Sequence, residues 1–556
     1  MKCIRKINTN FDIKIVALIV TIVTVALLVM YPILVLIGYS FGISFNGIEI
    51  SLDAYKNLFF NKEVYFAVKN TLYIGFCITL FAGLLGGGLA FLVTKTDILC
   101  KKLIEKLIFG TFVIPSYIMA IAWIEIAGHN GFFTRFLYQF FNTKNPFEIY
   151  SLEGIIFVMV LHLYPMVFIN ISNALKNMDS NLEKAGFISG ASSKKVISTI
   201  IIPIIMPSIF SILLFVFSKS IACFGVATVL GLPARKYVVT TYIFSSLSSL
   251  DIGSAVSLSV LLLIISGILF MLNNKYLKSK EYTSTNIVND ERYIYSLGKF
   301  KIVITIIILF FLFLTSFVPI IMIVISSFLK KWGIPLTFKN MTLNNYYNIL
   351  FEERIARSAI KNSIIYGLIS ATIACVIGMV ISYISNRTKT RCKKIVEFLS
   401  SLPMAIPETV LAIAAIFAWK NEPLKLYGTP WIIIVTYIGI CLPMIVKNVN
   451  GLMIGFDPIL EKASEINGAS CIQTFKRIVI PMILPGIKAG FMMSMIFVLR
   501  EIPVSIMLYS RGYETIGVLI YNLRSDTGGL EVVSAIAVII IILITIGQLV
   551  IQKQRR

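Results

Sequence analysis

Charged residues are scarce in this chain: Asp, Glu, Lys and Arg make up 14% of its 556 residues, whereas 57% are hydrophobic. A soluble globule of this size needs a larger polar share to cover its surface. The composition therefore excludes a soluble protein and indicates one that crosses a membrane several times.

The chain also has few histidines and no closely spaced cysteines. The chain has two histidines, His129 and His162, and its eight cysteines show no C-x-x-C spacing. This pattern argues against a disulfide framework and against a metal site. Carboxylates paired with metal-binding histidines and nucleophile motifs are also absent, so we expect neither an enzyme nor a cofactor bound by this chain.

The chain also lacks the motif G-x-x-x-x-G-K-[ST], in which a glycine-rich loop holds the phosphates of ATP. We therefore expect no ATP hydrolysis by the chain itself. If its activity is driven by ATP, the energy must come from another polypeptide.

Acidic residues are outnumbered by basic ones, 27 to 50, which gives a formal net charge of +23. In a soluble domain this excess would indicate nucleic acid, but here Lys and Arg lie in short loops between apolar runs. Placing both termini in the cytoplasm puts most of these loops' basic residues on the cytoplasmic side, as the positive-inside rule requires. We predict a multi-pass protein of the cell (plasma or inner) membrane, in contact with the lipid bilayer and not with nucleic acid.

Twelve apolar runs are long enough to cross the hydrocarbon core, which takes about 20 helical residues. They lie near residues 13–38, 70–94, 107–127, 152–174, 204–230, 254–273, 301–328, 362–385, 397–419, 430–447, 483–508 and 532–551. The first run is too long for the apolar part of a signal peptide, and we expect it to remain as an anchor. The predicted fold class is an all-α polytopic membrane protein with twelve transmembrane helices.

One polar stretch between the apolar runs occurs twice. Residues 182–192 read LEKAGFISGAS and residues 460–470 read LEKASEINGAS, 278 positions apart (461 − 183 = 278). The twelve helices are therefore predicted to form two parallel six-helix repeats, since each half holds an even number of spans. The predicted domains are a first six-span domain at 1–274, a cytoplasmic linker at 275–300 and a second six-span domain at 301–556.

Landmarks nearer the start of each half are further apart. Ile114-Pro115 and Ile406-Pro407, in the third apolar run of each half, differ by 292 positions (407 − 115 = 292). The first half must therefore carry 14 extra residues before the repeated stretch (292 − 278 = 14). We place them in the external segment from Gly128 to Tyr150.

Each repeated stretch is predicted to form a helix-turn-helix along the cytoplasmic face. The first copy opens with Ser180-x-x-Glu183, the pattern of a capping box, and the second opens with Asp457-Pro458, a cap followed by proline. A glycine, Gly190 or Gly468, ends the first helix of each copy, where left-handed or tightly packed backbone is favourable. A second stretch then leads to a proline at which the next span can start.

The repeated pattern of E-x-A, a glycine a few residues later and then I-x-x-P resembles the coupling loop of permease subunits of binding-protein-dependent ABC importers. Two such loops in one chain are similar to the fused, two-domain permeases of the iron(III) importer family. The resemblance implies two copies of an ATPase subunit that binds ATP and magnesium, one on each loop, and an extracytoplasmic solute-binding protein. The residues implied in ATPase coupling are Glu183, Ala185, Gly190, Glu461, Ala463 and Gly468. The alternative is that the two glutamates only cap their own helices.

Iron(III) is the cargo that the resemblance favours, because residues 224–241 and 500–515 are similar to the segments that follow the fifth span in iron(III)-type permeases. Thiamine, 2-aminoethylphosphonate and polyamines are the alternative cargoes. An ion-coupled secondary transporter also has two parallel six-span halves. The loop at 95–106 lacks the G-x-x-x-D-R-like motif of that class.

Ionisable residues inside apolar runs are costly and are therefore candidates for function. Lys219, Arg500 and Glu501 lie in the fifth run of the two halves. They could line a transport pathway, or they could pair across helices for assembly. The sequence leaves both interpretations open.

Overall fold

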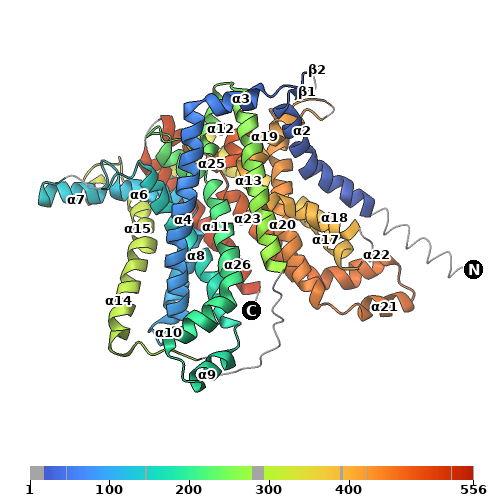
Figure 1. The fold of residues 1–556 in the computed structure, drawn as a ribbon. Coiled ribbons are helices and arrows are strands. Elements are labelled where there is room, and N and C mark those ends of the chain that lie inside the picture. Colours follow the sequence, from blue (N-terminus) through green and yellow to red (C-terminus); the bar gives the residue numbers. More distant parts are fainter. Residues whose placement is uncertain are drawn as a thin grey trace, which may run out of the picture.

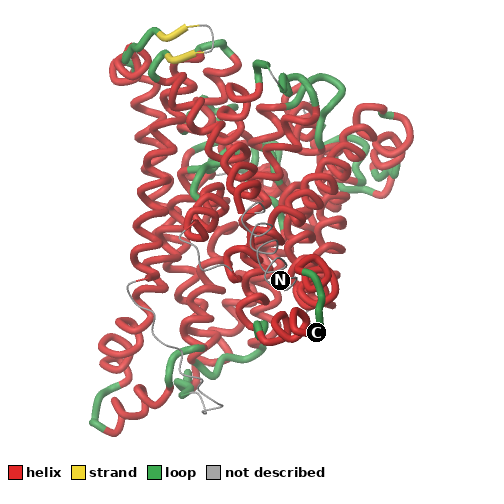
Figure 2. Tube along the Cα trace, turned by 90° about the vertical axis from the view of Figure 1, so that its right-hand side faces the viewer, coloured by secondary structure: helices red, strands yellow, loops and turns green. Residues whose placement is uncertain are grey.

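The computed structural model of the chain describes residues 18–44, 47–143, 147–278, 293–387, 392–422, 424–526 and 529–554. Helices make up most of these residues, which also include one antiparallel pair of short strands, β1 (Ile43–Ser44) and β2 (Gly47–Ile48) (Figure 2). Residues 279–292 of the predicted linker lie outside the described residues. So do residues 1–17 and 555–556, on which the prediction about the termini rests.

The helices follow one another in the same general order in both halves. The first half contains η1 (Ala26–Met30), α2 (Tyr31–Ser40), α3 (Asp53–Phe60), α4 (Lys62–Lys95), α5 (Lys101–Val113), α6 (Ser116–Ala127), α7 (Phe132–Phe141), α8 (Leu152–Lys176), α9 (Ser180–Ile188), α10 (Ser193–Val196), η2 (Ile197–Ile201), α11 (Ile202–Ile221), η3 (Ala227–Gly231), α12 (Val239–Ser248) and α13 (Ile252–Lys278). The second half contains η4 (Gly298–Phe300), α14 (Lys301–Leu312), η5 (Phe313–Phe317), α15 (Val318–Ser327), η6 (Phe338–Asn340), α16 (Asn344–Tyr347), η7 (Asn348–Glu352), α17 (Arg354–Arg387), α18 (Cys392–Ser401), η8 (Leu402–Met404), α19 (Glu408–Trp419), α20 (Pro430–Gly455), α21 (Ile459–Ile466), α22 (Cys471–Thr474), η9 (Phe475–Val479), α23 (Ile480–Arg500), α24 (Pro503–Leu508), α25 (Ile516–Asp526) and α26 (Leu530–Gln554).

Ten helices of the described chain are long and apolar enough to cross a membrane. They are Leu18–Ser40, Lys62–Lys95, Leu152–Lys176, Ser193–Ile221, Ile252–Tyr276, Gly298–Ser327, Arg354–Arg387, Pro430–Gly455, Ile472–Arg500 and Leu530–Val550. Two bent helix pairs pass the same test only as pairs, and counting each as one span gives twelve. The predicted fold class is confirmed on this count.

Both repeated stretches, in α9 and α21, lie at the same end of the bundle, as parallel repeats require (Figure 1). We call this end the loop end. The opposite end carries β1, β2 and α3 and is called the hairpin end.

The third predicted span of each half is not a straight helix. The run at 107–127 is broken between α5 and α6, which are bent by 98°, and the run at 397–419 is broken before α19, with a bend of 109°. Both breaks fall at the Ile-Pro landmarks, where Pro115 and Pro407 are in extended backbone with ψ of 141° and 139°. Proline has no N–H to donate and disfavours helical backbone in the residue before it, so the break has a local cause.

The fifth span of each half starts earlier than predicted, because the second helix of each repeated stretch runs into it without a break. Ser193–Ile221 and Ile472–Arg500 are single helices. A π turn, η2 or η9, ends two residues before the proline in each, which is how the helix accommodates a residue without an N–H. The first of these spans ends at Ile221, so the predicted end near residue 230 is wrong.

The first span of each half packs on the other half. In the first half, the Tyr31 hydroxyl of α2 donates to the Ala418 carbonyl of α19 at 3.2 Å, and its ring lies 5.2 Å from Trp419. In the second half, Ser316 of η5 is hydrogen-bonded to Thr111 of α5. The two halves therefore contact each other through both broken spans.

The second and fourth spans of each half cross closely at a glycine. A Cβ on Gly86 of α4 would lie 2.6 Å from the Tyr164 carbonyl oxygen and 2.7 Å from Cβ of Val167. The equivalent Gly378 of α17 would place a Cβ 2.7 Å from Ile445. Small residues allow membrane helices to approach closely, so the second and fourth spans form a closely packed pair in each half.

Candidate functional site

The first repeated stretch is held by a cap that the sequence did not predict. The N-cap of α9 is Asp179, whose Oδ1 accepts a hydrogen bond from the Asn181 amide at 2.9 Å. Ser180 and Glu183 do not form a capping box, because the Glu183 carboxylate faces Lys95 instead. The prediction of a capping box is therefore wrong.

In the second copy, the predicted cap is confirmed. Asp457 Oδ1 accepts a hydrogen bond from the Ile459 amide at 2.9 Å, and α21 begins at Ile459, one residue after the proline. Both predicted glycines have left-handed backbone, with φ of +81° at Gly190 and +85° at Gly468. Each directly follows the end of its helix, as a C-terminal cap does.

Both glutamates of the repeated stretches form ion pairs inside the protein. Lys95 Nζ pairs with Glu183, and these side chains are 1% and 0% exposed. Arg387 Nε donates to Glu461 Oε1 at 2.5 Å, with side chains 13% and 11% exposed. Lys95 and Arg387 are the last residues of α4 and α17 and differ by 292 positions (387 − 95 = 292), so the ion pair is duplicated along with the fold.

These ion pairs join each loop helix to the second span of its own half. The two carboxylates therefore point into the protein and not out of the loop surface, an arrangement that neither interpretation of the sequence anticipated. The lysine and arginine that form the pairs lie 88 and 74 residues from their glutamates, so local sequence patterns could not reveal them.

The outward surfaces of α9 and α21 share several matched positions. Ala185, Gly190, Ala463 and Gly468 are all exposed. Beside them stand two apolar side chains in each copy: Leu182 and Ile188 are 46% and 88% exposed, and their equivalents Leu460 and Ile466 are 46% and 85% exposed. Each loop thus presents a small apolar ridge at the loop end of the bundle.

The described end of the predicted linker reinforces the first loop. The Tyr293 ring stacks on Phe187 of α9 with centroids 4.5 Å apart. Tyr295 donates its amide to the Lys95 carbonyl at 2.7 Å, and its hydroxyl lies 3.5 Å from Glu183 Oε2. Burial raises the pKa of the Tyr295 phenol, which keeps it a neutral donor.

In the second half, the hydroxyl comes from Tyr383 of α17 itself, which donates to Glu461 Oε2 at 3.2 Å. The position equivalent to Phe187 is the exposed Glu465. The two loops are therefore alike in their ion pairs and outward ridges but differ in how they are braced.

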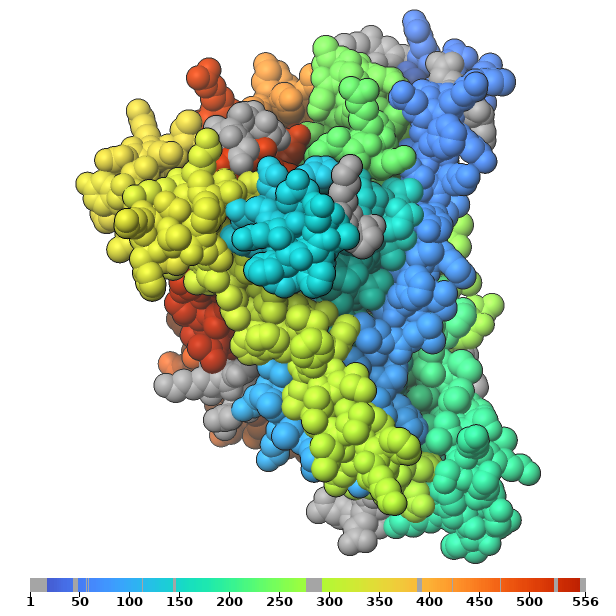
Figure 3. All heavy atoms as spheres, turned by 90° about the vertical axis from the view of Figure 1, so that its left-hand side faces the viewer, coloured from blue at the N-terminus to red at the C-terminus, as the bar shows by residue number. Residues whose placement is uncertain are grey.

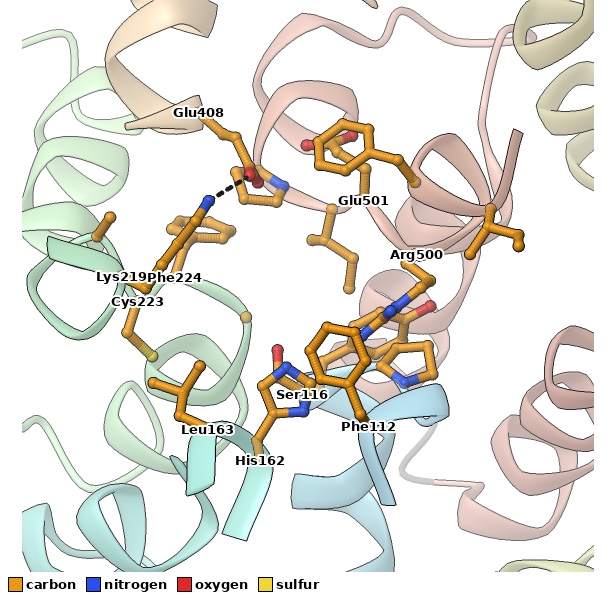
Figure 4. A pocket seen from close by; sticks show the side chains of 18 of the residues that line it. Phe112, Ser116, His162, Leu163, Lys219, Cys223, Phe224, Glu408, Arg500 and Glu501 are labelled. Carbon is orange, nitrogen blue, oxygen red and sulfur yellow. Dashed lines mark ion pairs between the residues drawn. The ribbon is translucent and has the colours of Figure 1, made fainter. Parts of the chain in front are cut away.

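A cavity of about 480 Å³ lies between the two halves, next to the breaks at Pro115 and Pro407 (Figure 4). All three charged residues singled out in the fifth spans, Lys219, Arg500 and Glu501, line it. The structure therefore brings these predicted site residues together from both halves.

Each charged group in the cavity has a different partner. Lys219 Nζ lies 3.6 Å from Glu408 Oε1 of the other half (Figure 4). The Arg500 guanidinium stands 5.1 Å from the centre of the Phe112 ring, also across the halves. Glu501 accepts hydrogen bonds from the Val504 amide and from the Tyr437 hydroxyl, the latter at 2.7 Å, and so caps α24.

A second cavity of about 400 Å³ lies beyond the first, beside α6 and α25. The two cavities share Tyr117, Gly225 and Ile502, which therefore form the wall between them. Tyr117 is 1% exposed, and a Cβ on Gly225 would lie 3.3 Å from the Tyr117 Cβ, so this wall is closely packed. Figure 1 places α25 toward the hairpin end, and the second cavity is thus the one nearer that end.

Several cavity residues were not among the predicted site residues. Glu408 and Ser116 directly follow Pro407 and Pro115, and recognising the prolines as breaks would have pointed to them. Tyr117 carries no such signal. No group of three or more His, Cys, Asp or Glu side chains is gathered anywhere in the described ranges, and His162 lies against Phe112 with ring centroids 6.0 Å apart.

Comparison with known proteins relates both halves to one family. The family described as "Binding-protein-dependent transport system inner membrane component" matches residues 80–280 and 374–556. The chain is 27% identical over 445 residues to the ferric transport system permease protein FbpB of Actinobacillus pleuropneumoniae, which covers 79% of this chain and 62% of that protein. It is 23% identical over 485 residues to the Fe(3+)-transport system permease protein FbpB 2 of Haemophilus influenzae, with 86% and 88% covered.

A single-domain relative matches only part of the chain. The spermidine/putrescine transport system permease protein PotC of Haemophilus influenzae is 26% identical over 250 residues, which is 44% of this chain and 95% of that protein. The chain spans less than two thirds of the length of the first ferric relative. Because the family match extends over most of both halves, this chain belongs to the inner membrane components of binding-protein-dependent transport systems.

Proposed function

We propose that this chain supplies both membrane domains of an ATP-driven importer for iron(III). The observation that carries the proposal is the duplicated loop: two helices at one end of the bundle, each with an apolar ridge outside and an ion pair inside. A duplicated element of this kind fits two copies of one partner. The partner in this proposal is an ATPase subunit, which binds the ATP and magnesium that this chain does not hold.

The ion pairs define how movement would pass from the ATPase into the membrane. When the ATPase subunits close, they displace α9 and α21, and the pairs Lys95–Glu183 and Arg387–Glu461 carry that displacement into α4 and α17. Glu183 and Glu461 are then positioning residues of the coupling loops, and the ATPase touches Ala185, Ala463 and the ridges beside them. The loop end is cytoplasmic in this arrangement, with both termini on the same side.

The pathway in this proposal runs through the two cavities at the seam between the halves. Cargo delivered by a solute-binding protein enters at the hairpin end, and the wall of Tyr117, Gly225 and Ile502 separates it from the central cavity. Tyr117→Ala would remove the largest part of this wall. We expect it to produce an ATP-independent leak of cargo into proteoliposomes, whereas the matched variant Tyr164→Ala, at a tyrosine that lines neither cavity, should not.

The names of the two ferric relatives support iron(III) as cargo, since they match 79% and 86% of the chain, whereas the polyamine relative matches 44%. The cavity holds both signs of charge: Lys219 and Arg500 would repel iron(III) and a polyamine alike, and the carboxylates of Glu408 and Glu501 could attract either cation.

A second candidate cargo is 2-aminoethylphosphonate, and the observation that favours it is the guanidinium of Arg500. No salt bridge to Arg500 is found among the described residues, and guanidinium groups bind phosphonate-like anions well. Uptake of radioactive iron(III) by cells that express the complete system, measured with and without excess 2-aminoethylphosphonate, separates the two. Iron uptake that the phosphonate does not reduce supports iron(III) as the cargo. Uptake of the phosphonate without uptake of iron contradicts iron(III) as the cargo.

The loop assignment is tested with Ile188→Glu and Ile466→Glu, which change only the ridges and leave both ion pairs intact. We expect the double variant to lose co-purification with the ATPase subunit and to lose transport. Asn181→Glu with Lys462→Glu puts glutamates on other exposed positions of the same helices, with a larger change of charge than the ridge variant, and should retain both. Unchanged co-purification of the ridge variant would contradict the proposed docking site.

A further inference from the structure

Helix α7 (Phe132–Phe141) has one apolar side and one polar side. At 100° per residue, the apolar side chains fall on one half of the helix and the polar ones on the other. The apolar half consists of Phe132, Phe133, Phe136, Leu137, Phe140 and Phe141, and the polar half of Thr134, Arg135, Tyr138 and Gln139. The helix contains no Asp, Glu or Lys.

Among the described residues, the side-chain hydrogen bonds that attach α7 to the rest of the protein come from its polar side, although Tyr138 on that side is 66% exposed. Thr134 Oγ1 donates to the Gly128 carbonyl at 2.8 Å, and Arg135 Nη1 donates to the Gly333 carbonyl at 2.7 Å. The apolar side is left uncovered: Phe133, Phe136 and Phe140 are 47%, 48% and 66% exposed. An amphipathic helix on a soluble surface would be turned the other way, with its apolar stripe toward the core.

The position of α7 matches the boundary of a membrane. The helix runs crosswise to the spans and projects from the side of the bundle (Figures 1 and 3). Its contact with Gly333 lies six residues beyond Ser327, the last residue of the span Gly298–Ser327. Along that span the outward surface is apolar, with Phe313, Phe317 and Ile321 exposed by 48%, 44% and 41%.

We propose that α7 lies in the interface of the bilayer leaflet at the hairpin end, with its phenylalanines between the headgroups and the acyl chains. Amphipathic helices that carry large apolar side chains such as Phe and Leu opposite a polar face bind there. The uncovered phenylalanines continue the lipid-facing surface of α14 and α15, so the same lipid that surrounds the spans covers them.

This placement gives α7 a role in holding the cavity wall. Only residues 128–131 separate α7 from α6, and α6 carries Tyr117 near its start. A helix fixed in the interface limits how far α6 can move along the membrane normal. In the second half, the described residues between α19 and α20 form no helix, so α7 accounts for most of the extra length of the first half.

The test uses the full-length chain in proteoliposomes and adds one tryptophan at a time. Phe140→Trp and Phe136→Trp report on the apolar side, and Gln139→Trp, one residue away, is the matched control. The emission of the four native tryptophans, measured in the unaltered chain, is subtracted. Monodisperse elution and an unchanged melting curve establish that each variant is folded.

We expect the added emission of Phe140→Trp and Phe136→Trp to be quenched at least two-fold by lipids brominated near the headgroup, and less by lipids brominated near the chain ends. Gln139→Trp should instead be quenched by aqueous iodide. Iodide quenching of the apolar-side variants, with no effect of brominated lipid, would overturn the proposal. Protection that arises only when the solute-binding protein is added would also overturn it, because α7 would then be a protein contact.

Discussion

Replacing Lys95 by methionine would remove the cation that the buried carboxylate of Glu183 faces. Both side chains are essentially inaccessible to solvent, and among the described residues the carboxylate has one further hydrogen-bond donor, the Tyr295 hydroxyl at 3.5 Å. A single neutral donor at that distance cannot replace an ion pair. The variant therefore leaves a carboxylate buried without a counter-ion.

The expected cost follows from this burial. Removing one member of a buried ion pair typically destabilises a protein by about 3–5 kcal/mol, whereas replacing both members by apolar residues of similar size is often close to neutral. Lys95→Met should therefore lower the free energy of unfolding by about 3–5 kcal/mol, and Lys95→Met with Glu183→Met should recover most of it. At the second pair, whose side chains are 13% and 11% exposed, Arg387→Met should cost less.

The assay is denaturant unfolding of the purified chain in detergent, measured for the unaltered protein, both single variants and the double variant. The double-mutant cycle isolates the interaction between the two side chains from their separate effects. A coupling energy below about 1 kcal/mol, or a double variant less stable than Lys95→Met alone, would refute the reasoning.

Three further predictions concern the backbone and the first loop. Gly190→Ala should destabilise by about 1–2 kcal/mol in the same unfolding assay, because the glycine has left-handed backbone and a new Cβ would meet no neighbour, which leaves the backbone as the only cost. Gly86→Ala should cost about 1–3 kcal/mol by overpacking the helix crossing, whereas Gly88→Ala in the same helix, where a Cβ meets nothing within 4 Å, should be neutral or stabilising; equal effects would contradict the crossing. The hydrogen bond that Asp97 accepts from the Leu297 amide lowers the pKa of Asp97. The bond therefore stabilises the end of the predicted linker above the ordinary aspartate pKa, and this contribution is lost as the pH falls through the lowered value. Hydrogen-exchange protection of the Leu297 amide should fall over that range in the unaltered chain and stay level in Asp97→Asn.

Much of the fold could be predicted from the sequence because length and hydropathy alone decide which segments can cross a membrane. The duplicated stretch gave the two parallel halves, and the difference between its offset and that of the Ile-Pro landmarks located the extra residues that α7 largely accounts for. These inferences use only counting along the chain, which folding does not alter.

Counting along the chain could not predict the breaks in the third spans. Pro115 and Pro407 interrupt their runs, yet Pro165 and Pro443 remain inside the long helices α8 and α20. A proline removes one hydrogen bond in each case, and the packing around it decides whether the helix continues. Apolar residues stand on both sides of all four prolines, so the presence of apolar neighbours does not mark the breaks.

The internal partners of the two loop glutamates could not be predicted either. The E-x-A pattern indicates glutamates on the outward surface of the loop. The carboxylates instead face basic residues at the ends of α4 and α17. Lys95 and Arg387 could have been noticed only by applying the 292-residue offset to residues outside the repeated stretch (387 − 95 = 292).

The central claim is that α9 and α21 each bind one ATPase subunit on the cytoplasmic side. It is tested most directly by placing a photo-reactive amino acid at Ile188 or at Ile466 in the assembled transporter and identifying what each position cross-links to. The account predicts that, in inside-out vesicles, both positions cross-link to the ATPase subunit with equal yield. Cross-linking of either position to lipid or to the solute-binding protein, or of only one position to the ATPase, would contradict it.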